Sequence, residues 1–183
     1  MPAIKVGVMG AANDALPVEE RARLTILAER LGGAIAARGC ICLTGATTGL
    51  PDMVARAAKR NGALTIGISP AISRSEHVDR YRLPEDGAEI IVYTGFGLKG
   101  RNVINIRSCD IVIIFGGATG TLNEFTIAYD EGKVIGVLRG SGGIADHIDE
   151  LLGFCKKPTT ARLYFSTDPE ALLDNCLAGL DGR

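Results

Sequence analysis

The sequence has almost no net charge and lacks a long apolar run. Its 183 residues hold 20 Lys and Arg against 21 Asp and Glu, which gives a net charge of −1. This balance argues against nucleic acid or an anionic membrane as a main partner, because both are usually bound by a strongly basic surface. The longest apolar stretch, Ile111–Phe115, is far shorter than the roughly 18 residues of a membrane span. Because the N-terminal MPAIKVGVMG is typical of a strand rather than a signal peptide, we expect a cytoplasmic protein.

Histidine and cysteine are also sparse. The two histidines, His77 and His147, have no second metal-ligating residue nearby, so the sequence predicts neither a zinc site nor a Cys–His nucleophile pair. The cysteines form no CxxC motif, and Cys40 and Cys42 would share one face of a strand, which prevents them from bridging each other. We expect buried, reduced thiols at all five positions, which are Cys40, Cys42, Cys109, Cys155 and Cys176.

Short β-branched runs alternate with helical stretches along the chain. The predicted strands are Ile4–Met9, Cys40–Thr44, Leu64–Ile68, Glu89–Tyr93, Ile111–Phe115, Val134–Leu138 and Arg162–Phe165. The predicted helices are Val18–Arg38 (opened by Pro17 and ended near Gly39), Pro51–Arg60, Gly100–Ser108, Thr121–Glu131, Ile144–Cys155 and Pro169–Leu177. This alternation predicts one doubly wound, Rossmann-like α/β domain over residues 1–183, with a largely parallel sheet of about seven strands. The irregular stretch Ser69–Gly87 is either a mobile flap or a crossover between strands, and we favour the crossover.

Glycine is abundant, with 24 residues, and it gathers where the predicted strands end. In doubly wound sheets, ligands bind beyond the carboxyl ends of the strands, where helix N-termini point. Four glycine-rich turns on one edge indicate a surface at which the backbone approaches a ligand closely. The residues that we expect to bind the ligand or its phosphate are Gly10, Ala11, Gly45, Ala46, Gly49, Gly117, Ala118, Thr119, Gly120 and Thr121.

Two standard nucleotide motifs are missing. The dinucleotide fingerprint requires G-x-G-x-x-G after the first strand, and Gly7–Gly10 has the wrong spacing. No Gly-Lys-Ser/Thr tripeptide is present, which excludes a P-loop. An NAD site and ATP hydrolysis by a P-loop are therefore not expected.

The turn after Ile111–Phe115 reads GGATGTLNE and has two interpretations. Consecutive backbone N–H groups, aligned with the dipole of the following helix, would hold a phosphate without a lysine. Alternatively, Thr121 and Glu124 have the spacing of a capping box, which stabilises a helix by about 1 kcal/mol and needs no ligand. Spacing alone does not separate the two.

Three motifs resemble one protein family. The segment Gly116–Glu124 resembles the PGGxGTxxE signature of the Lonely-Guy-type Rossmann proteins, once called lysine decarboxylases. Thr44–Met53 resembles their GGG-x-G-(L/V)-M segment, and Gly100–Asn102 resembles their arginine segment. The similarity extends over nearly the whole chain.

Within this superfamily the sequence is more similar to the molybdenum-cofactor carrier proteins than to the enzymes. Carriers commonly have R-N after the glycine and G-G-x-x-G-T before the glutamate, as here. The enzymes have Pro at the position of Gly116, Gly at Ala118 and Glu at Asn123. The resemblance implies a binding protein for a nucleotide or a molybdenum-cofactor-like pterin phosphate, which needs no cofactor for catalysis.

The alternative is a nucleoside 5′-monophosphate phosphoribohydrolase. In such enzymes the residues matching Arg101 and Glu124 cleave the N-glycosidic bond, and the resemblance makes these two the candidate catalytic residues. A carboxylate beside C1′ would stabilise the positive charge on the ribose or activate water. Arg101 is otherwise a solvated arginine at a helix start, but a cation there is disfavoured without an acid or anion nearby, so we favour a role in the pocket. Arg107 is interpreted as surface charge.

The sequence also bears on a decarboxylase activity, on base stacking and on the oligomeric state. A pyridoxal-phosphate decarboxylase using Lys99 has little support, because no acidic partner for the cofactor is evident. A nucleotide or pterin usually stacks on an aromatic ring; the sequence has no Trp, and Tyr93 and Phe96 are the candidates near the glycine-rich edge. The first helix is apolar enough to bury more than one face, and the superfamily is usually dimeric or tetrameric, so we expect a homo-oligomer.

Overall fold

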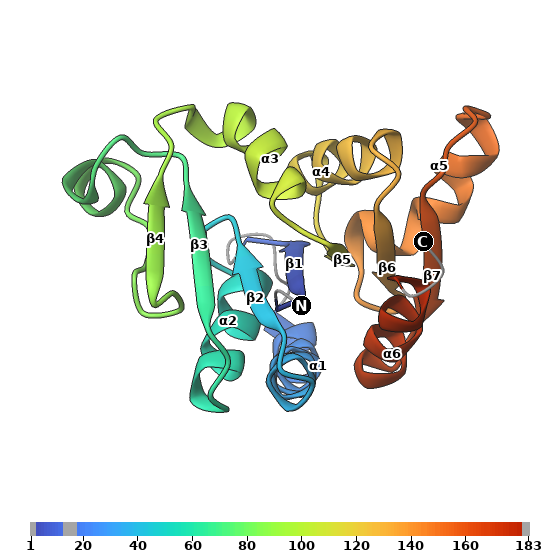
Figure 1. The fold of residues 1–183 in the computed structure, drawn as a ribbon, viewed down its shortest axis with the longest axis horizontal. Coiled ribbons are helices and arrows are strands. Elements are labelled where there is room, and N and C mark those ends of the chain that lie inside the picture. Colours follow the sequence, from blue (N-terminus) through green and yellow to red (C-terminus); the bar gives the residue numbers. More distant parts are fainter. Residues whose placement is uncertain (1–2, 13–17, 181–183) are drawn as a thin grey trace.

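The computed structural model describes residues 3–12 and 18–180, which form an α/β domain around a seven-stranded sheet (Figure 1). All six strand pairings are parallel, and the strand order is β4-β3-β2-β1-β5-β6-β7. The strands are β1 (Lys5–Gly10), β2 (Ile41–Thr44), β3 (Thr65–Ser69), β4 (Ile90–Tyr93), β5 (Ile111–Phe115), β6 (Val134–Leu138) and β7 (Arg162–Ser166). The predicted Rossmann-like class and the seven strands are confirmed.

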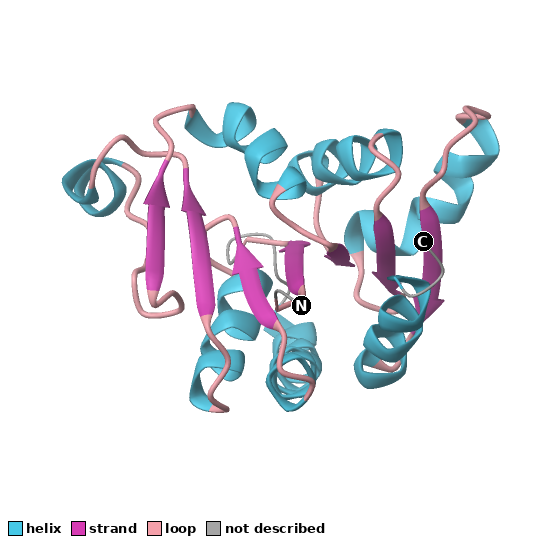
Figure 2. Cartoon of the chain, in the orientation of Figure 1, coloured by secondary structure: helices cyan, strands magenta, loops and turns pink. Residues whose placement is uncertain are grey.

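Helices cover both faces of the sheet and make two cores (Figure 2). One face packs against α1 (Val18–Ala37), α2 (Leu50–Arg60) and α6 (Pro169–Leu180). The other packs against α3 (Gly97–Arg107), α4 (Thr119–Asp130) and α5 (Ile148–Phe154), with the short 3₁₀ helix η3 (Gly143–His147) before α5. Because both faces are covered, every residue of β5 and β6 is buried, which explains their uninterrupted apolar sequences.

Several predicted helices have bounds that differ from those observed. Helix α3 begins at Gly97 instead of Gly100, because the glycine-rich turn after β4 forms the helix start, with Gly97 at a φ of +66°. The predicted helix Ile144–Cys155 is divided, since the backbone of His147 leaves the helical region at φ −117° and ψ 4°. Helix α6 extends to Leu180 rather than Leu177. The predicted role of Pro17 in opening α1 lies outside the described residues.

The segment between β3 and β4 is fastened to the sheet. It contains the π-helix η2 (Glu76–Arg80), whose His77 is fully buried. The imidazole Nδ1 lies 2.8 Å from Ser69 Oγ and Nε2 lies 3.1 Å from the Pro84 carbonyl oxygen. The ring also contacts the edge of Tyr93. His77 is therefore a structural residue, and the segment is the crossover that the sequence favoured.

Four of the five cysteines are buried and free, as predicted. The exception is Cys155, which is exposed because it follows the last turn of the short helix α5. Burial raises the pKa of Cys42, Cys109 and Cys176 to about 12, which makes these thiols poor nucleophiles. Within the described residues, no helix has the length and apolar character needed to cross a membrane.

Candidate functional site

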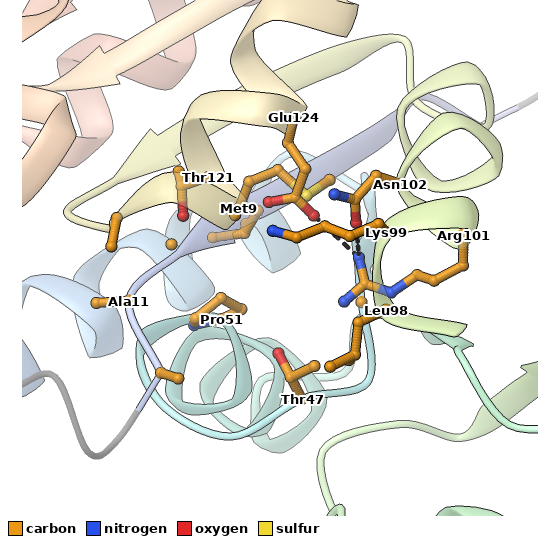
Figure 3. A pocket seen from close by; sticks show the side chains of 16 residues that line it. Met9, Ala11, Thr47, Pro51, Leu98, Lys99, Arg101, Asn102, Thr121 and Glu124 are labelled. Carbon is orange, nitrogen blue, oxygen red and sulfur yellow. Dashed lines mark hydrogen bonds and ion pairs between the residues drawn. The ribbon is translucent and has the colours of Figure 1, made fainter. Parts of the chain in front are cut away.

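A cavity of about 360 Å³ opens beyond the carboxyl ends of β1 and β2 (Figure 3). Strand β1 lies between β2 and β5, where the chain changes direction across the sheet, and this is where doubly wound folds bind ligands. Helices α3 and α4 each contribute side chains from their N-terminal halves. The predicted site residues that line the cavity are Gly10, Ala11, Gly45, Arg101, Ala118, Gly120, Thr121 and Glu124.

Arg101 and Glu124 form a buried ion pair at the wall of this cavity. Nη1 of Arg101 donates to Glu124 Oε1 at 2.9 Å and to the Asn102 side-chain oxygen at 2.7 Å. Only 5% of Arg101 and 7% of Glu124 are exposed to solvent. The guanidinium lies against the backbone of Gly45, where a Cβ atom would overlap it. Arg101 thus lines the cavity with an acid close by, and its role in binding or catalysis stays a prediction.

Burial raises the pKa of the Glu124 carboxyl above its usual range, because the neutral form is favoured away from water. The charge and hydrogen bond of Arg101 oppose this shift, as do a hydrogen bond from Asn105 and the charge of Lys99. Glu124 therefore sits in an environment that tunes proton affinity, which is a common property of carboxylates that act in catalysis or ligand binding.

The capping-box interpretation of Thr121 and Glu124 is wrong. Helix α4 begins two residues earlier than predicted, with Ala118 as its N-cap and no side chain closing the first turn. Thr121 and Glu124 are consequently inside the helix, and the Glu124 side chain turns to Arg101 instead of reaching back to the helix start. The first N–H groups of α4 have no carbonyl partner within the helix, as at any α-helix N-terminus.

The turn before α4 is held from outside by the chain that follows β6. The backbone N–H of Gly116 donates to Ser141 Oγ at 2.8 Å, and the N–H of Ile144 donates to the Gly117 carbonyl at 2.8 Å. Gly116 and Gly117 have φ values of +63° and +96°, which side chains rarely adopt. These hydrogen bonds hold the turn in place, and the turn positions the start of α4 at the cavity.

Four predicted site residues do not line the cavity. Gly49, just before α2, lets the backbone of α2 pack closely against Ala11, which follows β1. A Cβ atom at position 49 would overlap the Ala11 carbonyl oxygen. Gly117 allows the same approach to the Thr121 side chain. The other two are Ala46, which is buried behind the wall with a φ of +52°, and Thr119, which is exposed. Small residues at these turns thus do not all mark contact with a ligand.

The expected aromatic platform is absent from the residues that line this cavity. Tyr93 packs against His77, and Phe96 points to solvent with 66% of its surface exposed. A nucleobase or pterin placed in this chain would contact aliphatic side chains such as Leu98 and Pro51.

Several polar residues of the site were not identified from the sequence. Lys99 lines the cavity beside Arg101, although its predicted role in a decarboxylase had little support. Asn102 donates to Asn123 at 2.8 Å, linking α3 to α4, and Asn105 donates to the sulfur of Met9 at 3.2 Å. The signal available in the sequence was the polar face formed by Arg101, Asn102 and Asn105 on a helix expected to pack against the sheet.

Comparison with known proteins identifies a family and several similar structures. A model of the SLOG cluster4 family matches residues 3–173. An uncharacterized protein of Archaeoglobus fulgidus is 34% identical over 139 residues, which cover 76% of this chain and 82% of that protein. The molybdenum cofactor binding protein of Rippkaea orientalis is 27% identical, with a TM-score of 0.79 over 98% of this chain and 99% of that chain. The molybdenum cofactor carrier protein of Chlamydomonas reinhardtii is 24% identical, with a TM-score of 0.75 over 98% and 99% of the two chains.

The fold is shared with a nucleic-acid-binding protein at greater distance. DNA processing protein A of Helicobacter pylori, which binds single-stranded DNA, is 18% identical and has a TM-score of 0.59 over 98% of this chain and 81% of that chain. At this identity the likeness concerns the fold alone. The absence of nucleic-acid binding, expected from the low net charge, therefore stays a prediction.

Proposed function

Because the chain belongs to the SLOG cluster4 family, we propose that it binds a phosphorylated small molecule in the cavity beyond β1 and β2. The ligand class is a nucleotide or a molybdenum-cofactor-like pterin phosphate, carried as cargo. The observation that carries this proposal is the start of α4, which reaches the cavity with no side-chain cap and no acidic residue in its first turn. Free N–H groups and the helix dipole bind phosphate at such positions.

The other residues of the cavity wall favour a ligand that ends in a small anionic group. Gly10, Ala11 and Gly45 bring backbone to the cavity without bulk, and Thr121 adds a hydroxyl. The likeness to a molybdenum cofactor binding protein over nearly the full length of both chains supports the pterin phosphate as one candidate. Neither Gly117 nor Thr119 lines the wall, so Gly117 would contribute through the turn before α4 and Thr119 as the first residue of the helix.

A charge placed at Gly120 tests this proposal. Gly120 lies in the first turn of α4, and a Cβ there would have open space, with Lys99 Nζ 3.6 Å away. Gly120→Asp should keep the fold, because an acid is favourable at a helix N-terminus, and should exclude phosphate by repulsion. The wild-type melting temperature should rise with AMP or another phosphorylated ligand, by about 5–10 °C at a hundredfold excess over Kd. That rise should disappear in Gly120→Asp.

The matched control is Gly153→Asp, which adds the same charge at a helix position with nothing within 4 Å of the new Cβ. It should respond to ligand as the wild type does. If neither nucleotides nor molybdenum cofactor shift the wild-type melting temperature, the proposed function is wrong.

A second candidate function is hydrolysis of a nucleoside 5′-monophosphate to the free base and ribose 5-phosphate. It is favoured by one observation: Glu124 takes no part in capping α4 and lines the cavity beside Arg101. In this reaction water adds to C1′, the N-glycosidic bond breaks, and the base leaves with a proton. Glu124 would stabilise the positive ribose or accept a proton from water, while Arg101 would hold the carboxylate in place.

Chromatography of AMP, IMP, GMP and CMP after incubation with the protein decides between the two functions. If the chain is a hydrolase, free base appears, and Glu124→Gln reduces its release by at least about a hundredfold, as expected for a positioned acid or base. Glu131→Gln is the control, since it removes an exposed carboxylate paired with Arg107 outside the cavity. A ligand-dependent rise in melting temperature without any free base would show that the chain binds but does not hydrolyse.

A further inference from the structure

We propose that Lys99 supplies the cation that holds a phosphate monoester against the first turn of α4, while Arg101 serves to position Glu124. This inference rests on the proposed function and assigns the anion-binding charge within the same cavity. It differs from the expectation drawn from the sequence, in which backbone N–H groups held the phosphate without a lysine.

The side chain of Lys99 reaches from α3 into the cavity (Figure 3). Its Nζ lies 3.6 Å from the position that a Cβ of Gly120 would occupy, in the first turn of α4. The missing side chain at Gly120 therefore leaves a space bounded by an ammonium group on one side and by the start of a helix on the other. A tetrahedral anion in this space would meet both.

Among the described residues that line the cavity, the charged side chains have a net positive charge, with Lys99 and Arg101 against Glu124. Lys99 is the third residue of α3, where the helix dipole already disfavours a cation. The first turns of α3 and α4 contain no acidic residue. Glu124 is the single carboxylate among the lining residues that the structure describes, and its Oε1 accepts a hydrogen bond from Arg101. Uncompensated positive charge of this kind is typical of an anion site.

The charge of Arg101 is paired with that of Glu124, and its buried Nε has no hydrogen-bond partner among the described residues. Its Nη1 contacts both Glu124 and Asn102, and the guanidinium is confined between these groups and the backbone of Gly45. Lys99 is exposed and forms no ion pair with any residue that the structure describes. When the charges are added, the Arg101–Glu124 pair cancels and Lys99 remains.

This arrangement selects the terminal group of the ligand. Two helix N-termini and one ammonium favour an anion of two charges, such as a phosphate monoester, over a neutral nucleoside. Calorimetric titration of AMP and of adenosine into the full chain measures this preference, with inorganic phosphate as a probe for the anion alone. We expect wild-type protein to bind AMP more tightly than adenosine.

Replacing Lys99 tests the assignment. Lys99→Met should weaken AMP binding by roughly ten- to a hundredfold and leave adenosine binding unchanged, because one charge-assisted hydrogen bond is lost. Lys99→Arg should recover most of the affinity by restoring the charge. Lys156→Met, which removes an exposed lysine that does not line the cavity, should match the wild type. The melting temperature of each ligand-free variant confirms folding.

The possible results test the role of Lys99 and the proposed function separately. Unchanged AMP binding in Lys99→Met, with tight binding by the wild type, overturns the role of Lys99 and leaves the proposed function standing. Equal weakening for adenosine shows that Lys99 contacts the nucleoside and also overturns the assignment. If wild-type protein binds neither AMP, inorganic phosphate nor molybdenum cofactor, the proposed function fails and the inference fails with it.

Discussion

At Gly45, the absence of a side chain decides whether Arg101 can reach Glu124. The guanidinium occupies the space where a Cβ would project from Gly45. Two charged groups this deeply buried cost several kcal/mol each in lost hydration, and their mutual contact and the hydrogen bonds with Asn102 and Asn105 offset this cost. The glycine after β2 thus serves the ion pair in addition to shaping the wall of the cavity.

Gly45→Ala is therefore expected to disrupt the pair. The methyl group should force the Arg101 side chain away and reduce the free energy of unfolding by about 1–3 kcal/mol, the usual cost of overpacking. Chemical denaturation measures the change. Gly33→Ala is the control, since the new Cβ would meet its nearest atom at 4.0 Å within α1. That variant should gain about 0.5–1 kcal/mol from helix propensity. Equal stability of Gly45→Ala and wild type would show that Arg101 relocates without cost.

Sequence motifs and the resemblance to a known family identified half of the residues that line this cavity. Arg101 and Glu124 were identifiable because their motifs resemble a known family, and the structure places them 2.9 Å apart. Lys99 was not identified as a binding residue, because its importance depends on facing Gly120 across a cavity between two helices. Gly49 shows that a glycine at a strand-end turn can have a packing reason: it was assigned to the ligand, and the structure shows that it admits the backbone of Ala11.

At the scale of elements, the predicted strands were accurate because burial determines their sequences. Strands β5 and β6 match their predicted bounds residue for residue, since each is an apolar run buried throughout. The others shift by a residue at one or both ends, where pairing with neighbours sets the limit. Strand β4 lies at the edge of the sheet and alternates in exposure.

Helix starts were harder to predict, and the site depends on them. The sequence placed the start of α4 at Thr121, because Thr and Glu three residues apart are typical of a capping box. The helix begins instead at Thr119, after two glycines turn the chain with positive φ and Ser141 binds the turn. A contact made 25 residues away in sequence cannot be read from local spacing. This shift frees Glu124 to face Arg101.

At the scale of the whole molecule, the sheet topology creates the cavity. Strands β2, β3 and β4 follow one another on one side of β1, and β5 lies on the other side, directly beside β1. Helices α1 and α4, which follow these two central strands, lie on opposite faces of the sheet (Figure 1), and the cavity lies at the carboxyl edge between the two faces. The predicted fold class therefore indicated the correct edge, although not the side chains that line it.

The exposed apolar side chains gather in one part of the molecule. Helix α1 was expected to bury more than one face, but its apolar stripe is covered by the chain's own α2 and α6. Among the described residues, most large apolar side chains that remain exposed lie between 72 and 98, and they are Ile72, Val78, Ile90, Val92, Phe96 and Leu98. Exposed apolar surface of this kind is typical of contact with another protein.

We expect these residues, rather than α1, to carry the contact in a homo-oligomer. Val92 is 43% exposed on the edge strand β4, so Val92→Glu should place a charge in the interface and reduce the mass by light scattering to the 19.2 kDa monomer. Ile26→Glu, at a position on α1 that is 60% exposed, should leave the oligomer intact. A monomeric wild type at micromolar concentration would contradict self-association. If Ile26→Glu alone dissociates the oligomer, the interface lies on α1.

Leu98 belongs both to this exposed group and to the cavity wall. An oligomer formed through Leu98 would therefore bring a second copy of the chain to the mouth of the binding site.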